Sequence, residues 1–174
     1  FHFYNLQAYM LATYQCVISQ DGYEADDEMS MAQFGRDDTI ICSRDKDLRI
    51  TPGWHYSWEC GGQYSIGPSY TGPLGSLEVR SDGKTLGYGL KFFYYQLIVG
   101  DTADYIPGLP GRGDAFARQL LEDAVTERDM FERVQAAYKE KLEDNAKTYF
   151  REQADLLWMT QIRGQRYVPP PKES

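Results

Sequence analysis

Acidic side chains gather in three short clusters that are far apart in the chain. Their members are Glu24, Asp26 and Asp27, then Asp45 and Asp47, then Asp101 and Asp104. Carboxylates that lie a few Å apart repel one another and resist ionising together. Hard divalent cations relieve that repulsion, and Mg²⁺ prefers oxygen ligands of this kind. If the clusters meet in the fold, they predict phosphodiester hydrolysis by two bound cations, which needs no Ser, Cys or His nucleophile.

Each cluster also has an ordinary structural explanation. Acids at the start of a helix are usually capping and dipole partners, which would account for the first cluster. Asp45 and Asp47 alternate with basic residues, as in a solvated charged loop. Asp101 and Asp104 are of a type that is common in turns. The metal-site interpretation is favoured by the occurrence of all three clusters in one chain, followed by a glycine-rich turn.

The net charge of −8 argues at first against a nucleic-acid partner, because phosphate binding needs positive potential. The seven clustered acids carry most of that charge and leave −1 for the rest of the chain. Two divalent cations would cancel about four charges locally. The acidity is therefore compatible with a partner that carries phosphates.

Other features limit the class of protein. No apolar run is long enough to cross a bilayer, and no signal peptide is visible, so no membrane partner is expected. Cys16, Cys42 and Cys60 show neither CxxC pairing nor zinc spacing, which predicts a reducing, cytoplasmic environment. The two histidines, His2 and His55, have no evident triad setting.

The clusters lie at the ends of predicted secondary-structure elements. Residues 5–14 predict the end of a helix, and residues 16–19 predict a short strand. A helix is expected over 22–34, because acids fill its first turn and Gly35 follows its end. Residues 39–43 form a continuous apolar run, typical of a strand in a buried parallel sheet.

The order strand, helix, strand predicts a βαβ unit and hence a parallel sheet. In such a sheet, ligands bind beyond the carboxyl ends of the strands, where the first two acidic clusters would meet. Asp101 and Asp104 are three positions apart, so a helical turn would place them on one side.

The rest of the chain divides into a segment of unusual composition and a helical segment. Residues 51–89 are rich in Gly, Pro and aromatic residues. Within them, turn residues 81–84 predict a hairpin between 77–79 and 85–86. Further helices are expected over 90–97 (ending at Gly100), 114–125, 127–143 and 146–162, and a disordered tail over 169–174.

Three motifs make the chain resemble the 5′-nuclease superfamily, which comprises flap endonucleases, the 5′-nuclease domain of bacterial DNA polymerase I and phage 5′–3′ exonucleases. The motifs are GYEADD at 22–27, SRDKDL at 43–48 and GDTADYIPGLPGRG at 100–113. The insertion PGWHYSWE at 52–59 looks most like the phage branch. A phage protein would act in the cytoplasm of the bacterial host.

The resemblance implies an α/β fold class: a partial PIN-like parallel sheet flanked by helices, followed by a helix–three-turn–helix DNA-binding region. The metal-binding core would span 1–99, with its aromatic insertion at about 51–89. The DNA-binding region and the carboxy-terminal helices would span 100–168. By the same resemblance, the first metal site would contain Glu24, Asp26 and Asp45, the second Asp47, Asp101 and Asp104, and Asp27 would support both.

In the superfamily, the glycine turn grips the backbone of duplex DNA and often holds K⁺. Glycines allow backbone amides to approach a phosphate closely, and a helix start favours the anion. The corresponding glycines are Gly108, Gly111 and Gly113, and Arg112 and Arg118 are the expected phosphate partners; alternatively, these arginines are ordinary surface residues. Lys46 is also expected to contact DNA.

The function that the resemblance implies is a 5′–3′ exonuclease or 5′-flap endonuclease that uses two Mg²⁺ ions, with Mn²⁺ as a substitute. Its substrate would be DNA with a 5′ end, a flap or an RNA primer, and replication proteins would be further partners. The alternatives are a non-catalytic module that binds branched DNA with an incomplete metal site, and an unrelated Mg²⁺-dependent phosphatase.

Superfamily members begin with a strand that carries another metal-binding Asp, followed by a basic helical arch. Neither feature precedes Phe1 in this sequence. We therefore expect this chain alone to bind metal poorly and to cleave weakly or not at all.

The aromatic residues of the insertion allow two interpretations. They would stack unpaired bases, or they would fasten the insertion to the core, which we favour. They are Trp54, Tyr56, Trp58, Tyr64 and Tyr70.

Overall fold

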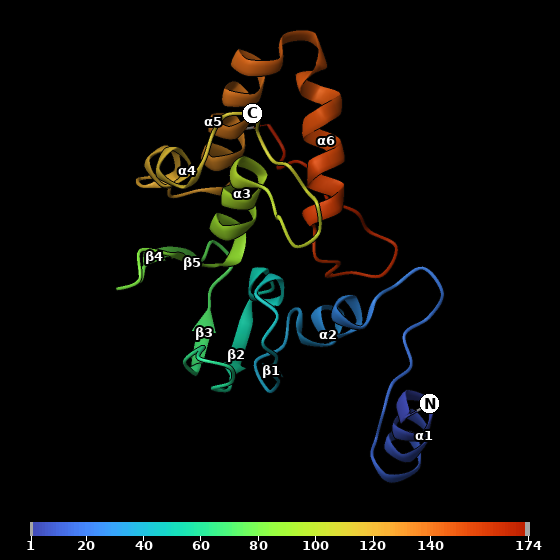
Figure 1. Cartoon of the computed structure of the whole chain (residues 1–174). Coiled ribbons are helices and arrows are strands. Elements are labelled where there is room, and N and C mark those ends of the chain that lie inside the picture. Colours follow the sequence, from blue (N-terminus) through green and yellow to red (C-terminus); the bar gives the residue numbers. More distant parts are fainter. Residues whose placement is uncertain (1, 173–174) are drawn as a thin grey trace.

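The computed structural model describes residues 2–172, which form a mixed α/β fold (Figure 1). In chain order its elements are α1 His2–Thr13, α2 Ala25–Gln33, β1 Ile40–Cys42, the 3₁₀-helix η1 Asp47–Ile50, β2 Gly53–Ser57, β3 Ile66–Thr71, β4 Ser76–Val79, β5 Thr85–Tyr88, α3 Gly89–Val99, α4 Asp114–Leu121, α5 Glu127–Leu142, the 3₁₀-helix η2 Glu143–Asn145 and α6 Ala146–Leu157.

The main sheet is mixed, so the prediction of a parallel sheet holds for one strand pair and is wrong for the other. Its strand order is β1-β2-β3, with β1 parallel to β2 and β2 antiparallel to β3. Residues 16–19 form no strand, and Val17 and Ile18 are exposed. A strand requires a neighbour for its backbone groups, and these residues belong to neither sheet.

The predicted strand at 39–43 exists as β1, but it is not buried on both faces. Ile41 is buried, whereas Ile40 and Cys42 are exposed. This alternation is the pattern of a half-buried strand. Its sequence is apolar throughout, and that apolarity conceals the alternation.

Several elements are confirmed. The hairpin forms from β4 and β5, which are antiparallel. The helices predicted over 22–34, 90–97, 114–125 and 127–143 correspond to α2, α3, α4 and α5. The helix expected to reach 162 ends earlier, because the backbone becomes extended at Trp158, immediately after α6.

Helix α3 is the centre of the molecule (Figure 1). It packs against η1, β4 and β5 on one side and against α4, α5 and α6 on the other. Phe93, Tyr94, Leu97 and Ile98 are fully buried, as expected for a helix that is apolar all round. One hydrophobic core thus joins residues on both sides of position 100.

Helix α1 contributes nothing to that core. None of its residues is buried, and Figure 1 shows it apart from the other elements. Residues 2–20 contain no Asp, Glu, Lys or Arg. Within residues 2–172, no helix combines the length and apolarity needed to cross a bilayer.

The aromatic side chains of the insertion do not fasten it to the core. Trp54 and Tyr70 pack edge to face on neighbouring strands, with ring centroids 5.6 Å apart. Both rings, together with those of Trp58 and Tyr64, are exposed. The preferred interpretation of these residues is therefore wrong for four of the five.

The predicted disorder over 169–174 lies partly outside the described residues, at 173–174. Residues 169–172 form no helix or strand. The carbonyl oxygen of Pro170 accepts a hydrogen bond of 3.1 Å from Arg128.

Candidate metal centre

Three of the predicted ligands form one compact group, which we call the acidic trio: Asp47, Asp101 and Asp104. One carboxylate oxygen from each lies within 4.8 Å of the others. The carboxylates differ in exposure, since Asp101 is buried, Asp47 is partly buried and Asp104 is exposed. Within residues 2–172 this is the only group of three or more His, Cys, Asp or Glu residues with such geometry.

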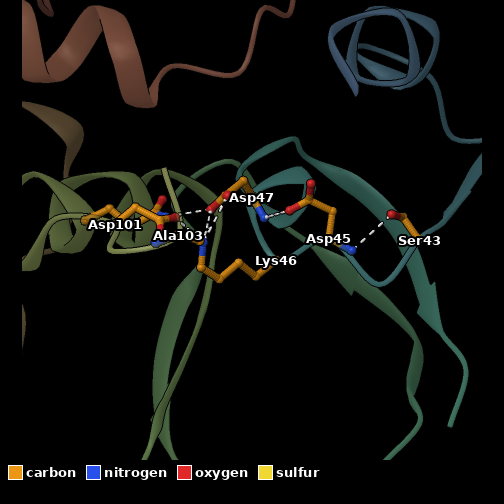
Figure 2. A network of polar contacts seen from close by, with 7 residues as sticks. Ser43, Asp45, Lys46, Asp47, Asp101 and Ala103 are labelled. Atoms are coloured by element: carbon orange, nitrogen blue, oxygen red, sulfur yellow. Dashed lines mark hydrogen bonds and ion pairs between the residues drawn. The ribbon is translucent and has the colours of Figure 1, made fainter. Parts of the chain in front are cut away.

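Two members of the trio come from the turn that follows α3. The helix ends at Gly100, whose φ of +74° lies in the left-handed region. Asp101 and Ile106 then exchange two backbone hydrogen bonds, of 2.7 and 2.8 Å. The amide of Ala103 donates to Asp101 Oδ1 at 3.0 Å, which fixes that carboxylate (Figure 2).

Asp47 is positioned by the loop that follows β1. The backbone amide of Asp45 donates to Ser43 Oγ at 3.1 Å, and the amide of Asp47 donates to Asp45 Oδ1 at 2.9 Å (Figure 2). The Asp45 side chain therefore supports the start of η1, as an acid at a helix start commonly does.

Lys46 lies against the trio. Its Nζ donates to the two oxygens of Asp47 at 3.1 and 3.0 Å and also to Asp101 Oδ2 (Figure 2). The predicted DNA contact is thus occupied by carboxylates in this structure. The side chain of Lys46 remains 42% exposed, whereas that of Asp101 is only 4% exposed.

Sequence reasoning missed Gln96. This α3 residue is 2% exposed, and its Nε2 donates to Asp47 Oδ1 at 2.6 Å. Its Oε1 is buried and has no hydrogen-bond partner within the described chain. The available signal was an amide within an otherwise apolar stretch, FFYYQLIV.

The electrostatics of the site follow from burial and pairing. Burial raises the pKa of Asp47, although hydrogen bonds from Lys46 and Gln96 oppose that rise. Burial alone would lower the pKa of Lys46, but its hydrogen bonds to Asp101 and Asp47 outweigh that effect and raise it. The ammonium group is therefore retained beside the acids.

The trio fits a hard divalent cation by the chemistry of its donors. All of them are carboxylate oxygens, which such cations prefer. The unpartnered oxygen of Gln96 adds a buried acceptor next to Asp47. Mg²⁺ usually keeps several waters, and a buried acceptor can orient one of them.

The first acidic cluster is placed differently. Glu24 and Asp26 lie at the opening of α2 and, like Asp45, are not part of the trio. Burial raises the pKa of Asp26, and the charges of Asp27 and Asp45 raise it further. The charge of Asp45 is thus close enough to act on the pKa of Asp26.

Asp27 has structural partners. Its Oδ2 accepts a hydrogen bond from the Glu24 amide at 3.3 Å, within a capping box. Its Oδ1 accepts another from the Thr160 amide at 3.0 Å. These contacts account for both carboxylate oxygens.

The segment after α6 fastens this end of α2 in two further places. Arg163 donates to both oxygens of Glu28, at 2.9 and 2.7 Å. The Gly164 amide donates to Tyr23 Oη at 2.8 Å. The acidic opening of α2 is therefore held by residues from the far end of the described chain.

The arginines predicted to bind phosphate are paired with acids. Arg112 donates to Glu140 at 3.0 Å and lies over the Phe116 ring, 4.4 Å from its centroid. Arg118 forms an ion pair of 2.9 Å with Asp114, in the first turn of α4. Both arginines would have to release these partners to contact a phosphate.

The glycines of the turn have distinct roles. Gly108 is buried, has a φ of +65° and donates its amide to Gln153 Oε1 at 3.0 Å, so that amide is already in use. Gly111 has a φ of +74° and lies near Lys141, a cation that sequence reasoning did not single out. Gly113 is the N-cap of α4.

Comparison with protein families, curated sequences and solved structures returned no significant match. The resemblance to 5′-nucleases therefore rests on the three motifs. The structure brings together acids from two of these motifs, SRDKDL and GDTADY.

Proposed function

We propose that this chain carries the metal-binding part of a Mg²⁺-dependent 5′-nuclease that hydrolyses DNA phosphodiesters. The observation that carries this proposal is the convergence of Asp47 with Asp101 and Asp104 within 4.8 Å. The motifs that contribute them are widely separated in the sequence, and the packing of η1 against α3 brings them together.

The roles follow from the contacts. The acidic trio would hold one cation, with Gln96 and the Ala103 amide orienting Asp47 and Asp101. A bound divalent cation supplies positive charge that polarises a phosphodiester and lowers the pKa of water. A second cation near Glu24, Asp26 and Asp45 belongs to the same proposal and rests on the resemblance of GYEADD and SRDKDL to the superfamily.

The finer architecture and the DNA contacts belong to the same proposal. We assign the sheet and its helices to a PIN-like core, and the glycine turn at 108–113 with its flanking helices to a helix–three-turn–helix element that holds K⁺. Arg112 and Arg118 would exchange Glu140 and Asp114 for backbone phosphates. Loss of one such contact should weaken DNA binding and reduce its dependence on salt.

The test is cleavage of a 5′-labelled flap substrate in Mg²⁺ or Mn²⁺. We expect weak cleavage by the wild-type chain and none by Asp104→Asn, because the variant removes the exposed ligand of the trio. Asp37→Asn is the matched control, since Asp37 is an exposed acid outside all three clusters. Measurable cleavage that is equal in the wild type and both variants would exclude the assigned site.

A second candidate is a non-catalytic module that binds branched DNA. It is favoured by the placement of Glu24, Asp26 and Asp45 outside the trio and by the structural contacts of Asp27. Tight binding of a flap substrate, with no cleavage in either metal and no effect of Asp104→Asn on binding, would support this candidate instead.

A further inference from the structure

We infer that Lys46 is a built-in competitor for the cation site: its ammonium group occupies the acidic trio when no metal is bound and must leave when a metal enters. This inference rests on the proposed metal site and concerns its regulation. It also differs from the expectation that Lys46 simply contacts DNA.

The contacts of Lys46 carry the inference. Its Nζ reaches both oxygens of Asp47, at 3.1 and 3.0 Å, and also Asp101 Oδ2. Asp47 and Asp101 are two of the three members of the trio. One positive group thus binds carboxylates from two separate motifs, as a divalent cation would.

The ammonium group of Lys46 also neutralises negative charge in the metal-free site. Asp101 is 5% exposed, and a buried carboxylate without a positive partner is strongly unfavourable. Lys46 supplies that partner from within the chain. A divalent cation would supply more charge to the same oxygens, so the two cations compete for them.

The lysine is able to leave. Its side chain is 42% exposed, and lysine has a flexible four-carbon stem. Asp47 lies in η1, and the buried Gln96 donates a hydrogen bond to it from α3. Asp47 therefore keeps one neutral donor when the ammonium departs, and the site survives the exchange.

Competition of this kind predicts weak metal binding by the wild type and stronger binding once the ammonium is removed. We expect Lys46→Met to bind Mn²⁺ about tenfold more tightly, or more, since a nearby positive charge opposes the cation. Lys46→Arg keeps the charge and should bind as weakly as the wild type. Lys46→Gln, which keeps a hydrogen-bond donor, should behave like Lys46→Met.

The measurement is a titration of the full chain with Mn²⁺, following free Mn²⁺ by electron paramagnetic resonance. Lys91→Met is the matched control for net charge, because within residues 2–172 the Nζ of Lys91 donates only a long hydrogen bond, 3.5 Å, to the Glu122 carbonyl oxygen. It should change the affinity by less than about twofold, since distant surface charges are screened by salt.

The metal-free proteins provide a second readout. Without Mn²⁺, Lys46→Met should unfold at a lower temperature than the wild type, because Asp101 loses its positive partner. Saturating Mn²⁺ should raise its melting temperature by more than it raises that of the wild type.

The outcomes separate this inference from the metal site itself. If the wild type binds Mn²⁺, Asp104→Asn does not, and Lys46→Met is no tighter than Lys91→Met, the competitor role of Lys46 is wrong and the metal site stands. If no protein binds Mn²⁺, both are wrong. Tighter binding by Lys46→Met and Lys46→Gln, but not by Lys46→Arg, supports the competition.

Discussion

Gln96 shows how much of the candidate site depends on a neutral side chain. Its amide nitrogen lies 2.6 Å from Asp47 Oδ1, and its amide oxygen is buried without a partner in the described chain. Hydrogen bonds from such second-layer groups fix the orientation of a ligand and contribute to its affinity for metal. The hydrogen bond from Gln96 on α3 fixes Asp47 Oδ1 in this way.

We predict that Gln96→Leu will weaken Mn²⁺ binding by about 10- to 100-fold, because Asp47 loses its orienting donor. Leucine is apolar and of similar size, so α3 should remain packed. Gln33→Leu, a change of an equally buried amide on α2, is the control and should leave Mn²⁺ binding unchanged. Equal affinity in the Gln96 variant and the wild type would remove this residue from the site.

The sequence identifies the acids of the candidate site better than it identifies the neutral and basic residues that contact them. Asp47, Asp101 and Asp104 were identifiable because their motifs are contiguous and chemically distinctive. Gln96 was not, since its role is apparent only when α3 packs beside η1. The pairing of Arg112 with Glu140, 28 positions away, likewise depends on a tertiary contact.

Among the elements, the turn after α3 contributes most to the site. Gly100 and Gly108 approach each other so closely that a Cβ on either one would overlap backbone atoms of the opposite segment. This crossing places Asp101 at the end of α3. Two glycines of the superfamily-like motif thus have a structural role that is independent of phosphate binding.

We predict that Gly100→Ala will lower the free energy of unfolding by at least about 1–2 kcal/mol, the cost of a left-handed residue with a side chain. Overlap with Ile106 and Pro107 should add to this and displace Asp101, so Mn²⁺ binding should weaken as well. Urea unfolding and the Mn²⁺ titration measure the two effects.

Gly113→Ala is the matched control for that turn. Its φ is −139° and a Cβ there meets nothing within 4 Å. Alanine is a poorer N-cap than glycine by only part of a kcal/mol. If Gly113→Ala were as damaging as Gly100→Ala, the close crossing would not explain the first result.

Local elements, including the hairpin, were predictable, whereas strand pairing outside the hairpin was not. The hairpin of β4 and β5 depends on a turn within SDGK, and α3 depends on its own apolar run, so both are encoded locally. Residues 16–19 have the composition of a strand, but a strand also needs a partner, and β1 pairs with β2 instead. That choice is made by contacts distant in sequence, which composition does not reveal.

For the whole molecule, stability should depend on pH through His55. It is 5% exposed, and its Nε2 lies 2.8 Å from the Thr51 carbonyl oxygen. Burial lowers the pKa of His55 below its usual 6.5, and the charge of Arg49 acts in the same direction. Just below pH 6.5 the unfolded chain therefore binds more protons than the folded protein, so stability falls as the pH falls through this range.

We predict that the free energy of unfolding will decrease more steeply from about pH 7 to pH 5 for the wild type than for His55→Gln. The difference in slope should reach at most about 1.4 kcal/mol per pH unit, the value for one proton. His2 is present in both proteins and does not affect the comparison. Parallel pH profiles in urea unfolding would exclude His55 as the source.

The hydrogen bonds between the opening of α2 and the segment after α6 have a consequence for how the molecule assembles. They join residues 133 to 141 positions apart, so they can form only once segments from distant parts of the chain have come together. Long-range closure is slow compared with helix formation. Glu24 and its neighbours should therefore gain their final order late in folding, and their amides should exchange with solvent deuterium earlier than those of α3.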